Sequence, residues 1–474
     1  MNDASAVSML MRAVMPDGQI PARAGQGPAA QSAIRAGGID IALPGQGGLA
    51  SVFPVTDLAV ASIGAAAHAL AQLMADRFGA APAVEVDRRL ASFWFAATLR
   101  PDGWELPAAR DIITGDYATR DGWIRLHANV PTHREAALRV LGADADPESV
   151  ARAVSGRDAV ELEEAVVHAG GAAAAMRTQS EWAAHPQGRA VGMEPVFDRR
   201  DASPDDAPSG FSGTPERPLA GLRVLDLTRV LAGPVSTRFL AAYGAQVLRI
   251  DPPFWSEPGV VPEVTLGKRC ARLDLRIAEQ RQQLRRLMSR ADVLVHGYRP
   301  DVLDRLDLGA EARQALRPGL VDVCLDAYGW TGPWSGRRGF DSLVQMSSGI
   351  AHAGMLHAGG DRPVPLPVQA LDHATGYLIA AAAIRGLAAR LREGRGSLTR
   401  LSLARTAALL ATPLPAQVQP ALAPRTGDDY SAEPEVTPWG PAHRLKPPCR
   451  IQGAPMRWDY PAGPLGASAP CWTS

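Results

Sequence analysis

The chain has little lysine and no excess of charge of either sign. Only two of its 49 basic residues are lysines, and 49 acidic residues bring the formal net charge to zero. Without a basic excess, bulk electrostatics does not draw the molecule to nucleic acid or to an anionic membrane surface. We therefore expect neither nucleic acid nor a membrane as a partner.

Cysteine is also scarce, and long uninterrupted apolar runs are lacking. No C-x-x-C motif and no His/Cys cluster at metal-ligand spacing occurs, which predicts reduced thiols and no metal site. The first residues carry an acid, Asp3, and no long apolar stretch typical of a signal peptide. The Ala-rich run after Asp372 is interrupted by Arg385 and Arg390, too early for a membrane span. These features favour a soluble cytoplasmic protein.

A length of 474 residues leaves room for two or three domains. The stretch 197–218 is rich in Pro, Gly, Ser and Asp, and we place a linker at 201–218. After it, the pattern predicts a strand over 222–227, a helix over 234–243 and a strand over 246–250, which is a βαβ unit of a parallel sheet. The alternation continues, so residues 219–474 are expected to form a Rossmann-like open α/β domain with a C-terminal tail.

The first 200 residues are expected to form two smaller parts. Residues 101–200 mix strand and helix patterns and predict a small α+β domain. Within 1–100, residues 55–87 align with 370–402 without a gap when the chain is shifted by 315 positions, and Asp57 then meets Asp372. This internal similarity favours a degenerate partial copy at 1–100, although Ala-rich helices also resemble one another by chance.

Two short motifs bear on chemistry. Asp372 stands at the start of a long apolar helix, where an acid serves either as a helix cap or as a reacting group. The turn after the first strand of the βαβ unit, 228–236, has one glycine and no G-x-G-x-x-G, which disfavours a plain NAD-dependent enzyme. The segment 346–355 supplies small residues that fit either an oxyanion site or an ordinary turn.

Five segments between about 218 and 412 resemble, in order, the family III CoA-transferases, the group that includes formyl-CoA and carnitine CoA-transferases and α-methylacyl-CoA racemase. They read "PLAGLRVLDLTRVLAGPVSTRFLAAYGAQVLRID", "LGKRCARLDL", "ADVLVHGYRPDVLDRLDLG", "AYGWTGPWSGRRGFDSLVQMSSG" and "ALDHATGYLIAAAAIRGLAARLREGRGSLTRLSL". Residues 101–200 are similar to the small domain of that family, which normally follows the large one. The resemblance therefore implies two partial copies fused in one chain.

The resemblance implies a CoA-transferase that uses an aspartate to accept the acyl group of an acyl-CoA. The matching position is Asp372, and the matching oxyanion positions are Ser348 and Gly349. We expect Asp372 to be ionised, with the free N–H groups of the helix start stabilising its charge. The implied substrates are an acyl-CoA and a free carboxylic acid, with no permanently bound cofactor. Relatives form homodimers, an arrangement that a chain with two partial copies could also imitate alone.

The resemblance also points to residues that contact CoA: Val230, Leu231, Arg269, Tyr298, Arg299 and Arg305. Arginine suits bidentate phosphate contact. The sequence departs from the transferases at Pro252 and Pro253, where Arg often meets the nucleotide, and at Gly297, where Asn is common.

Two alternatives to a transferase stay open. Racemases of the family carry a His where this chain has Phe340, and phenylalanine cannot move a proton. His352, His357 and His373 lie near enough in sequence to leave an acyl-CoA racemase or isomerase open. The other alternative is a degenerate CoA-binding protein without catalysis. Asp57 is interpreted as a helix cap or as the relic of a former site, and the alternative is a second nucleophile.

Overall fold

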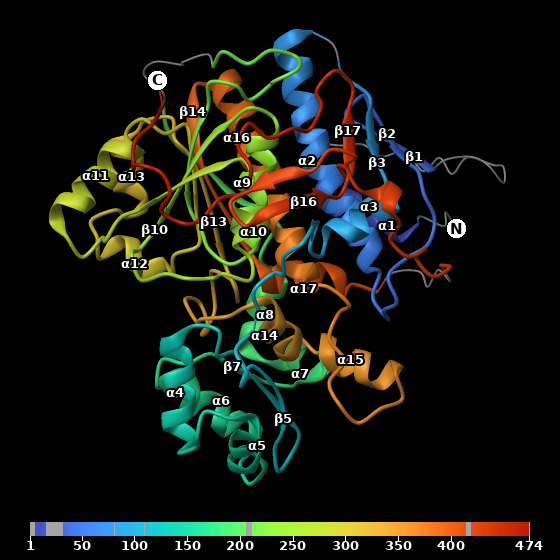
Figure 1. The fold of residues 1–474 in the computed structure, drawn as a ribbon, viewed down its shortest axis with the longest axis vertical. Coiled ribbons are helices and arrows are strands. Elements are labelled where there is room, and N and C mark those ends of the chain that lie inside the picture. The colour runs from blue at the N-terminus through green and yellow to red at the C-terminus, as the bar shows by residue number, and fades with distance from the viewer. Residues whose placement is uncertain are drawn as a thin grey trace.

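A seven-stranded sheet forms the centre of the molecule (Figure 1). The computed structural model describes residues 5–15, 32–79, 81–108, 110–204, 211–413 and 419–473. The strands stand in the order β11-β10-β9-β12-β13-β14-β8. Their bounds are β8 Asp198–Pro204, β9 Arg223–Leu227, β10 Gln246–Asp251, β11 Lys268–Arg272, β12 Val293–His296, β13 Val321–Asp326 and β14 Arg395–Ser402. All neighbours pair in parallel except β8, which runs antiparallel to β14 at the edge. The predicted α/β fold is confirmed.

The central strands are apolar and buried, as expected for a parallel sheet covered by helices on both faces. The connecting helices are α9 Ala232–Ala242, α10 Val261–Val264, α11 Ala278–Met288, α12 Pro300–Asp304 and α13 Ala310–Leu316. From β9 the chain proceeds outward to β10 and β11, and then returns to β12 on the other side. Such a reversal leaves a crevice at the carboxyl ends of the strands, where open α/β sheets bind their ligands.

Two long helices pack against each other beside the sheet (Figure 1). They are α2 Val55–Phe78 and α16 Ala370–Glu393, each of 24 residues and offset by 315 positions. The residue before each has nearly the same backbone torsions, φ −77° and ψ 63° at Pro54 and φ −74° and ψ 64° at Gln369. A glycine in the left-handed region ends both helices.

The same offset continues into the next two elements. Helix α2 is followed by β3 Val84–Val86 and α3 Arg88–Trp94, and α16 is followed by β14 and α17 Leu403–Leu410. The N-cap side chain of α3 is Asp87 and that of α17 is Ser402, and each accepts a hydrogen bond from the N–H three residues later. The two segments therefore share helix, strand and cap geometry.

Helix α2 is long and apolar enough to cross a membrane by length and composition. In this molecule 89% of its most apolar window is buried, and one continuous apolar cluster contains residues of α2, α9 and α16. An all-round apolar helix inside a folded core has the same composition as a membrane span. We therefore assign α2 to the core.

A small α+β unit lies at the bottom of Figure 1. Its sheet has the order β5-β6-β7, and it has its own apolar cluster. The elements are β5 Gly115–Ala118, β6 Trp123–Leu126, β7 Ala173–Ala175, α4 Pro131–Leu141, α5 Pro147–Ser155 and α6 Ala159–His168. Between this unit and the large sheet lie α7 Gln179–Ala184, α8 Pro186–Met193 and α14 Asp341–Ser347, and α15 Ile350–His357 lies to the right of them in Figure 1.

The N-terminal region and the C-terminal tail are folded together. Strand β17 Cys449–Ile451 pairs with β3, and β16 Gly440–Arg444 pairs with β4 Leu99–Pro101. The remaining described elements are α1 Ala6–Val14, β1 Ser32–Ala36, β2 Ile39–Leu43, β15 Glu435–Thr437 and a short 3-10 turn, Gly427–Asp429.

One segment differs from the expected linker. A linker was expected at 201–218, yet the chain from Asp198 to Pro204 forms the edge strand β8. Edge strands tolerate proline and charge, because one of their sides faces no neighbouring strand. Residues 205–210 of the expected linker lie outside the described residues.

Candidate active site

A cavity of about 410 Å³ lies at the carboxyl ends of the central strands, where the chain reverses direction in the sheet. The ends of β9, β12 and β13 contribute to it, as does the start of α16. Val130 and His133 of the small unit also contribute. Its volume falls within the ~300–1,000 Å³ typical of small-molecule sites.

Asp372 lines this cavity from the first turn of α16. Its side chain does not cap the helix, because that role belongs to Asp341 at the start of α14. The Asp341 carboxylate accepts the backbone N–H groups of Leu371 at 2.9 Å and Asp372 at 3.0 Å, and it also accepts a hydrogen bond from the Gln345 amide. A cap from another helix leaves the Asp372 carboxyl free for the cavity.

The two acids affect each other's proton affinity. Burial, opposed in part by its three hydrogen bonds, raises the pKa of Asp341 to about 6. Burial and then the neighbouring Asp341 carboxylate raise the pKa of Asp372 well above its ordinary value. The hydrogen bonds stabilise the anion on Asp341, so the proton of the pair resides on Asp372. The helix N–H groups that were expected to stabilise ionised Asp372 are bonded to Asp341 instead, and the pKa of Asp372 is raised rather than lowered.

Arginine side chains give the cavity a positive character. Arg229, Arg299, Arg337 and Arg338 line it. Within the described ranges, neither Arg299 nor Arg338 has a carboxylate within 4 Å, whereas Arg337 pairs with Glu163 at 2.9 Å. Burial, and then the charge of Arg299, lowers the pKa of Arg338. Two cations without a counter-ion favour an anionic substrate group.

An aromatic and cationic stack flanks the loop after β9. The Arg229 guanidinium lies over the rings of Trp255 and Tyr298, at 5.0 and 5.3 Å from their centroids, and donates to the Tyr298 hydroxyl at 3.0 Å. All three side chains line the cavity. Cation–π contact on both rings fixes the guanidinium in a lateral wall of the site.

Val230, in the same loop, adopts an unusual backbone conformation. Its φ is +65°, which is sterically unfavourable for a β-branched residue. The Val230 N–H donates to Glu257 at 2.9 Å, and Glu257 is paired with the fully buried Arg249. Such strain persists only where the surroundings impose it, and it is most common at functional sites.

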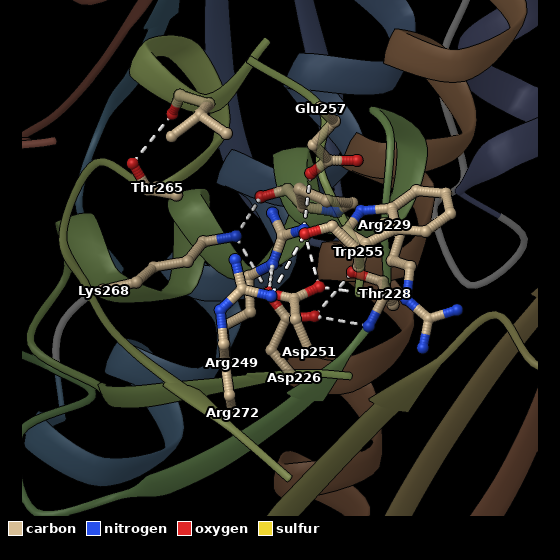
Figure 2. A network of polar contacts seen from close by, with 12 residues as sticks. Asp226, Thr228, Arg229, Arg249, Asp251, Trp255, Glu257, Thr265, Lys268 and Arg272 are labelled. Carbon is tan, nitrogen blue, oxygen red and sulfur yellow. Dashed lines mark hydrogen bonds and ion pairs between the residues drawn. The ribbon is translucent and has the colours of Figure 1, made fainter. Parts of the chain in front are cut away.

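A buried polar network supports this loop from below (Figure 2). Lys268 donates to Asp226 and to the Pro234 carbonyl, both at 2.9 Å, and the two charged side chains are fully buried. Asp226 also accepts hydrogen bonds from Thr228 and Thr237. These bonds connect the end of β9 to the start of α9 and hold the intervening loop in place.

The small unit contributes two histidines near Phe340. The His127 ring stacks on Phe340 with centroids 3.6 Å apart, and His133 meets the Phe340 edge at 5.9 Å. Burial lowers the pKa of His127 to about 3 and that of His133 to about 4, so both are neutral at pH 7. His133 lines the cavity. Phe340 therefore connects the small unit to the Asp341 loop by ring packing.

The histidines considered from the sequence lie elsewhere. His373 stacks on Phe95 at 5.4 Å, and burial lowers its pKa to about 3. His357 lines a second cavity described below, and His352 lies on α15. None of the three lines the Asp372 cavity.

The structure brings together some of the residues expected from the sequence and separates others. Val230, Leu231, Tyr298, Arg299 and Asp372 line the same cavity. The remaining four, Arg269, Arg305, Ser348 and Gly349, are not among its lining residues.

Three of the four separated residues, Arg269, Arg305 and Gly349, have another local role. Arg269 donates to the carbonyl of Cys471 at 2.6 Å and so holds the C-terminal tail, and Arg305 pairs with exposed Asp301 one helical turn away. Gly349 has φ +80°, and a Cβ there would lie 2.3 Å from the backbone nitrogen of Gln179. The close approach of α7 accounts for this glycine.

Among the cavity residues that were not found from the sequence are Arg338, His133 and Asp326. Asp326 ends β13, and an acid at the end of a buried parallel strand is a usable signal, because strand ends of this kind meet at the ligand crevice. Arg338 and His133 lie in loop and helix contexts that give no comparable signal.

A second cavity, of about 920 Å³, lies at the start of α2 and is lined by Asp57. Unlike Asp372, Asp57 is paired: Arg88 donates to it at 2.8 Å and Gln419 at 3.0 Å. Its charge is therefore neutralised within the protein. Among the described residues, no group of three or more His, Cys, Asp or Glu side chains could hold a metal ion.

The chain is similar in sequence to known proteins of one family. Residues 219–438 match the model of CoA-transferase family III. The acetyl-coenzyme A transferase nodX of Hypoxylon pulicicidum is 31% identical over 310 residues, which cover 60% of this chain and 52% of that protein. The probable fatty acyl-CoA transferase Rv3272 of Mycobacterium tuberculosis is 32% identical over 206 residues, covering 40% and 52%.

A further relative is the succinyl-CoA:glutarate CoA-transferase of Mus musculus, 33% identical over 193 residues that cover 38% of this chain and 44% of that one. The match to a crystal structure of Rv3272 covers 41% of this chain and 57% of the Rv3272 chain, with 29% identity and a TM-score of 0.38. The chain thus spans about half the length of the curated relatives it matches.

Proposed function

Because residues 219–438 belong to CoA-transferase family III, we propose that this chain transfers CoA between an acyl-CoA and a free carboxylic acid. We assign the acyl-carrying role to Asp372. The observation that carries the assignment is that the two acids have different roles. Asp341 caps α16, and this leaves the Asp372 carboxyl free in a cavity that also holds two arginines, Arg299 and Arg338, with no carboxylate partner among the described residues.

The proposed chemistry proceeds through acyl derivatives of one carboxylate. Ionised Asp372 attacks the thioester carbonyl carbon, the C–S bond breaks, and a mixed anhydride and CoA thiolate result. The thiolate attacks the aspartyl carbonyl, releases the donor acid as its carboxylate and leaves an aspartyl-CoA thioester. An acceptor carboxylate repeats these steps in reverse and leaves as the new acyl-CoA. A carboxylate suits this exchange as a nucleophile because it is either ionised, and then able to attack, or protonated.

The charges of the cavity support the substrate assignment. The phosphate groups of CoA need several positive partners, and Arg299 and Arg338 supply two. An anhydride lies higher in free energy than a thioester, so interactions with the remote part of CoA must lower the barrier of the first step. The strained Val230 loop and the stack of Arg229 between Trp255 and Tyr298 offer fixed contacts for that part.

We also propose that α2-β3-α3 and α16-β14-α17 derive from one duplicated segment. The constant offset of 315 residues and the shared cap torsions support this origin. In the N-terminal copy the acid is paired with Arg88, so we expect one reactive site per chain rather than two.

Trapping with hydroxylamine tests the proposal. The protein is mixed with acetyl-CoA or succinyl-CoA, the donors in the names of relatives, and then with hydroxylamine, and its peptides are analysed by mass spectrometry. We expect an aspartyl hydroxamate at Asp372, absent from Asp372→Asn and retained in the matched control Asp57→Asn. Exchange of the α-hydrogen in heavy water without a hydroxamate would instead establish a racemase, and neither signal with measurable CoA binding would establish a binding protein.

A further inference from the structure

A second carboxyl group shares the cavity with Asp372. Asp326 is the last residue of β13, the strand beside β12 in the parallel part of the sheet, and it lines the same cavity of about 410 Å³. A ligand that fills this cavity is therefore lined by both acids.

The two oxygens of Asp326 differ. Oδ1 accepts the Gly329 N–H at 2.9 Å and so shapes the turn after β13. Oδ2 is buried, and among the described residues it has no hydrogen-bond partner. Leaving a polar atom buried and unpaired costs about 1–3 kcal/mol, which the turn at Gly329 does not explain because it needs only one oxygen.

Burial, more than any neighbouring charge, favours the protonated form of Asp326. Burial raises its pKa to about 8, and Glu194 at the end of α8 adds to that rise. The Gly329 N–H and the Arg400 side chain on β14 oppose it. The cavity itself carries the cations Arg229, Arg299, Arg337 and Arg338, the neutral His133 and the acid Asp372. At pH 7 the Asp326 carboxyl is therefore a neutral group with one O–H to donate.

We propose that Asp326 donates this hydrogen bond to the carbonyl oxygen of the bound thioester while Asp372 attacks the carbonyl carbon. The inference rests on the proposed function and deepens it by naming the group that stabilises the developing oxyanion. The proton stays on Asp326 through the step, so the donor is neither consumed nor transferred. A buried carboxylic acid kept neutral in this way is an effective oxyanion donor, and removal of one such donor lowers rates ~10²–10³-fold.

Asp326→Asn and Asp326→Ala separate this role from a structural one. Asparagine retains the Oδ1 acceptor for Gly329, supplies a permanent N–H donor and does not titrate, whereas alanine lacks both. Single-turnover formation of the Asp372 adduct is measured from pH 6 to 10. In the unchanged protein we expect the rate to fall above about pH 8, as Asp326 ionises. In D326N the fall disappears, and in D326A the rate is ~10²–10³-fold below that of the unchanged protein at pH values under about 8 and shows no fall above about pH 8.

Binding to the unreactive Asp372→Ala protein tests the contact without any reaction. Affinity for acetyl-CoA and for its thioether analogue, which lacks the carbonyl oxygen, is measured at pH 7 and pH 9.5. We expect acetyl-CoA to lose affinity at the higher pH more than the thioether does, and we expect D326N in this background to remove the difference. Equal pH effects on the two ligands, or a difference that persists with D326N, would overturn the inference.

These two measurements also separate the inference from the proposed function. A protein that forms no adduct but shows the carbonyl-dependent pH effect contradicts the transferase assignment and supports the Asp326 contact. An adduct at Asp372 with an unchanged high-pH fall in D326N supports the transferase and contradicts the contact.

Discussion

The Asp341 carboxylate accepts a hydrogen bond from the backbone N–H of Asp372 at 3.0 Å, although 31 residues separate the two acids. Through this bond and the one from Leu371, a side chain on α14 caps α16. The acid in the first turn of α16 is therefore spared from capping. Its carboxyl instead belongs to the cavity, and its proton affinity depends on the charge of Asp341.

Asp341→Asn should shift the pH dependence of Asp372 acylation downward. The Asp341 charge contributes to the raised pKa of Asp372, so its removal lowers that pKa and ionises Asp372 at a lower pH. We expect the rising limb of the rate of adduct formation to move by about one unit or more toward acid, because a nearby like charge shifts a buried carboxyl by that order.

The measurement is the single-turnover rate between pH 5 and 9, with unfolding followed in parallel. Asp301→Asn serves as the control, since Asp301 lies exposed on α12 and pairs with Arg305. An unchanged or upward-shifted rising limb in Asp341→Asn would show that Asp341 acts on the helix alone.

Lys268→Met should destabilise the protein strongly. Lys268 and Asp226 are both fully buried, and loss of the ammonium leaves the Asp226 charge without its partner. Breaking a buried pair in this way costs about 3–5 kcal/mol of unfolding free energy. Urea denaturation gives the value. Arg305→Met, which breaks an exposed pair, is the control and should change stability by less than about 1 kcal/mol. A loss below 1 kcal/mol in Lys268→Met would show that the buried network does not stabilise the loop after β9.

The sheet was predictable from the sequence because its signals are local. The apolar run at 222–227, the helix from Pro234 and the next strand specify a βαβ unit without reference to distant residues. Asp372 was also identified locally, as an acid at the start of a long apolar helix. Its raised pKa was not, because the group that occupies the helix N–H donors comes from Asp341 on another element.

The arginines show what the local sequence does not determine, namely which of them lines the cavity. Arg269, on β11, and Arg338, in a loop, look alike in sequence as candidates for phosphate contact. The C-terminal tail passes over Arg269 and takes its hydrogen bonds at the Cys471 carbonyl, while Arg338 lines the cavity. Only the tertiary path of residues more than 130 positions away decides between them. The small residues at Ser348 and Gly349 misled in the same way, because the close packing of α7 accounts for Gly349.

Glu257→Ala should weaken acyl-CoA binding more than it slows chemistry. Glu257 accepts the Val230 N–H and pairs with Arg249, and without it the unfavourable φ at Val230 is no longer imposed. We expect KM for acyl-CoA to rise on the order of tenfold, which corresponds to ~1.4 kcal/mol, with kcat changed less. Glu257→Gln keeps an acceptor for Val230 and should show a smaller rise. Steady-state kinetics at saturating acceptor acid measures both. Equal KM values in the two variants and the unchanged protein would exclude a role for the loop conformation.

Asp57 lies 315 residues before Asp372, in the first turn of α2, and its surroundings predict a structural role. Its carboxylate is paired with Arg88 at 2.8 Å, and both side chains are largely buried. Asp57→Ala should therefore lower the unfolding free energy by about 3 kcal/mol or more, because it leaves the Arg88 charge buried without a partner. It should also leave hydroxamate formation at Asp372 intact.

A double-mutant cycle distinguishes pairing from reactivity at this position. If Asp57 serves mainly to neutralise Arg88, the double variant Asp57→Ala/Arg88→Ala loses less stability than the sum of the single variants, with a coupling of about 0.5–3 kcal/mol.

The strand registers add a reason to expect no chemistry at Asp57. Ile41 pairs with Val84, and Val323 pairs with Thr399, 315 residues after Val84. Counting three residues on from Ile41 and from Val323 matches Pro44 to Asp326. The N-terminal region thus has no acid at the position that corresponds to Asp326, and a hydroxamate found at Asp57 would contradict both this argument and the assignment of a single reactive site.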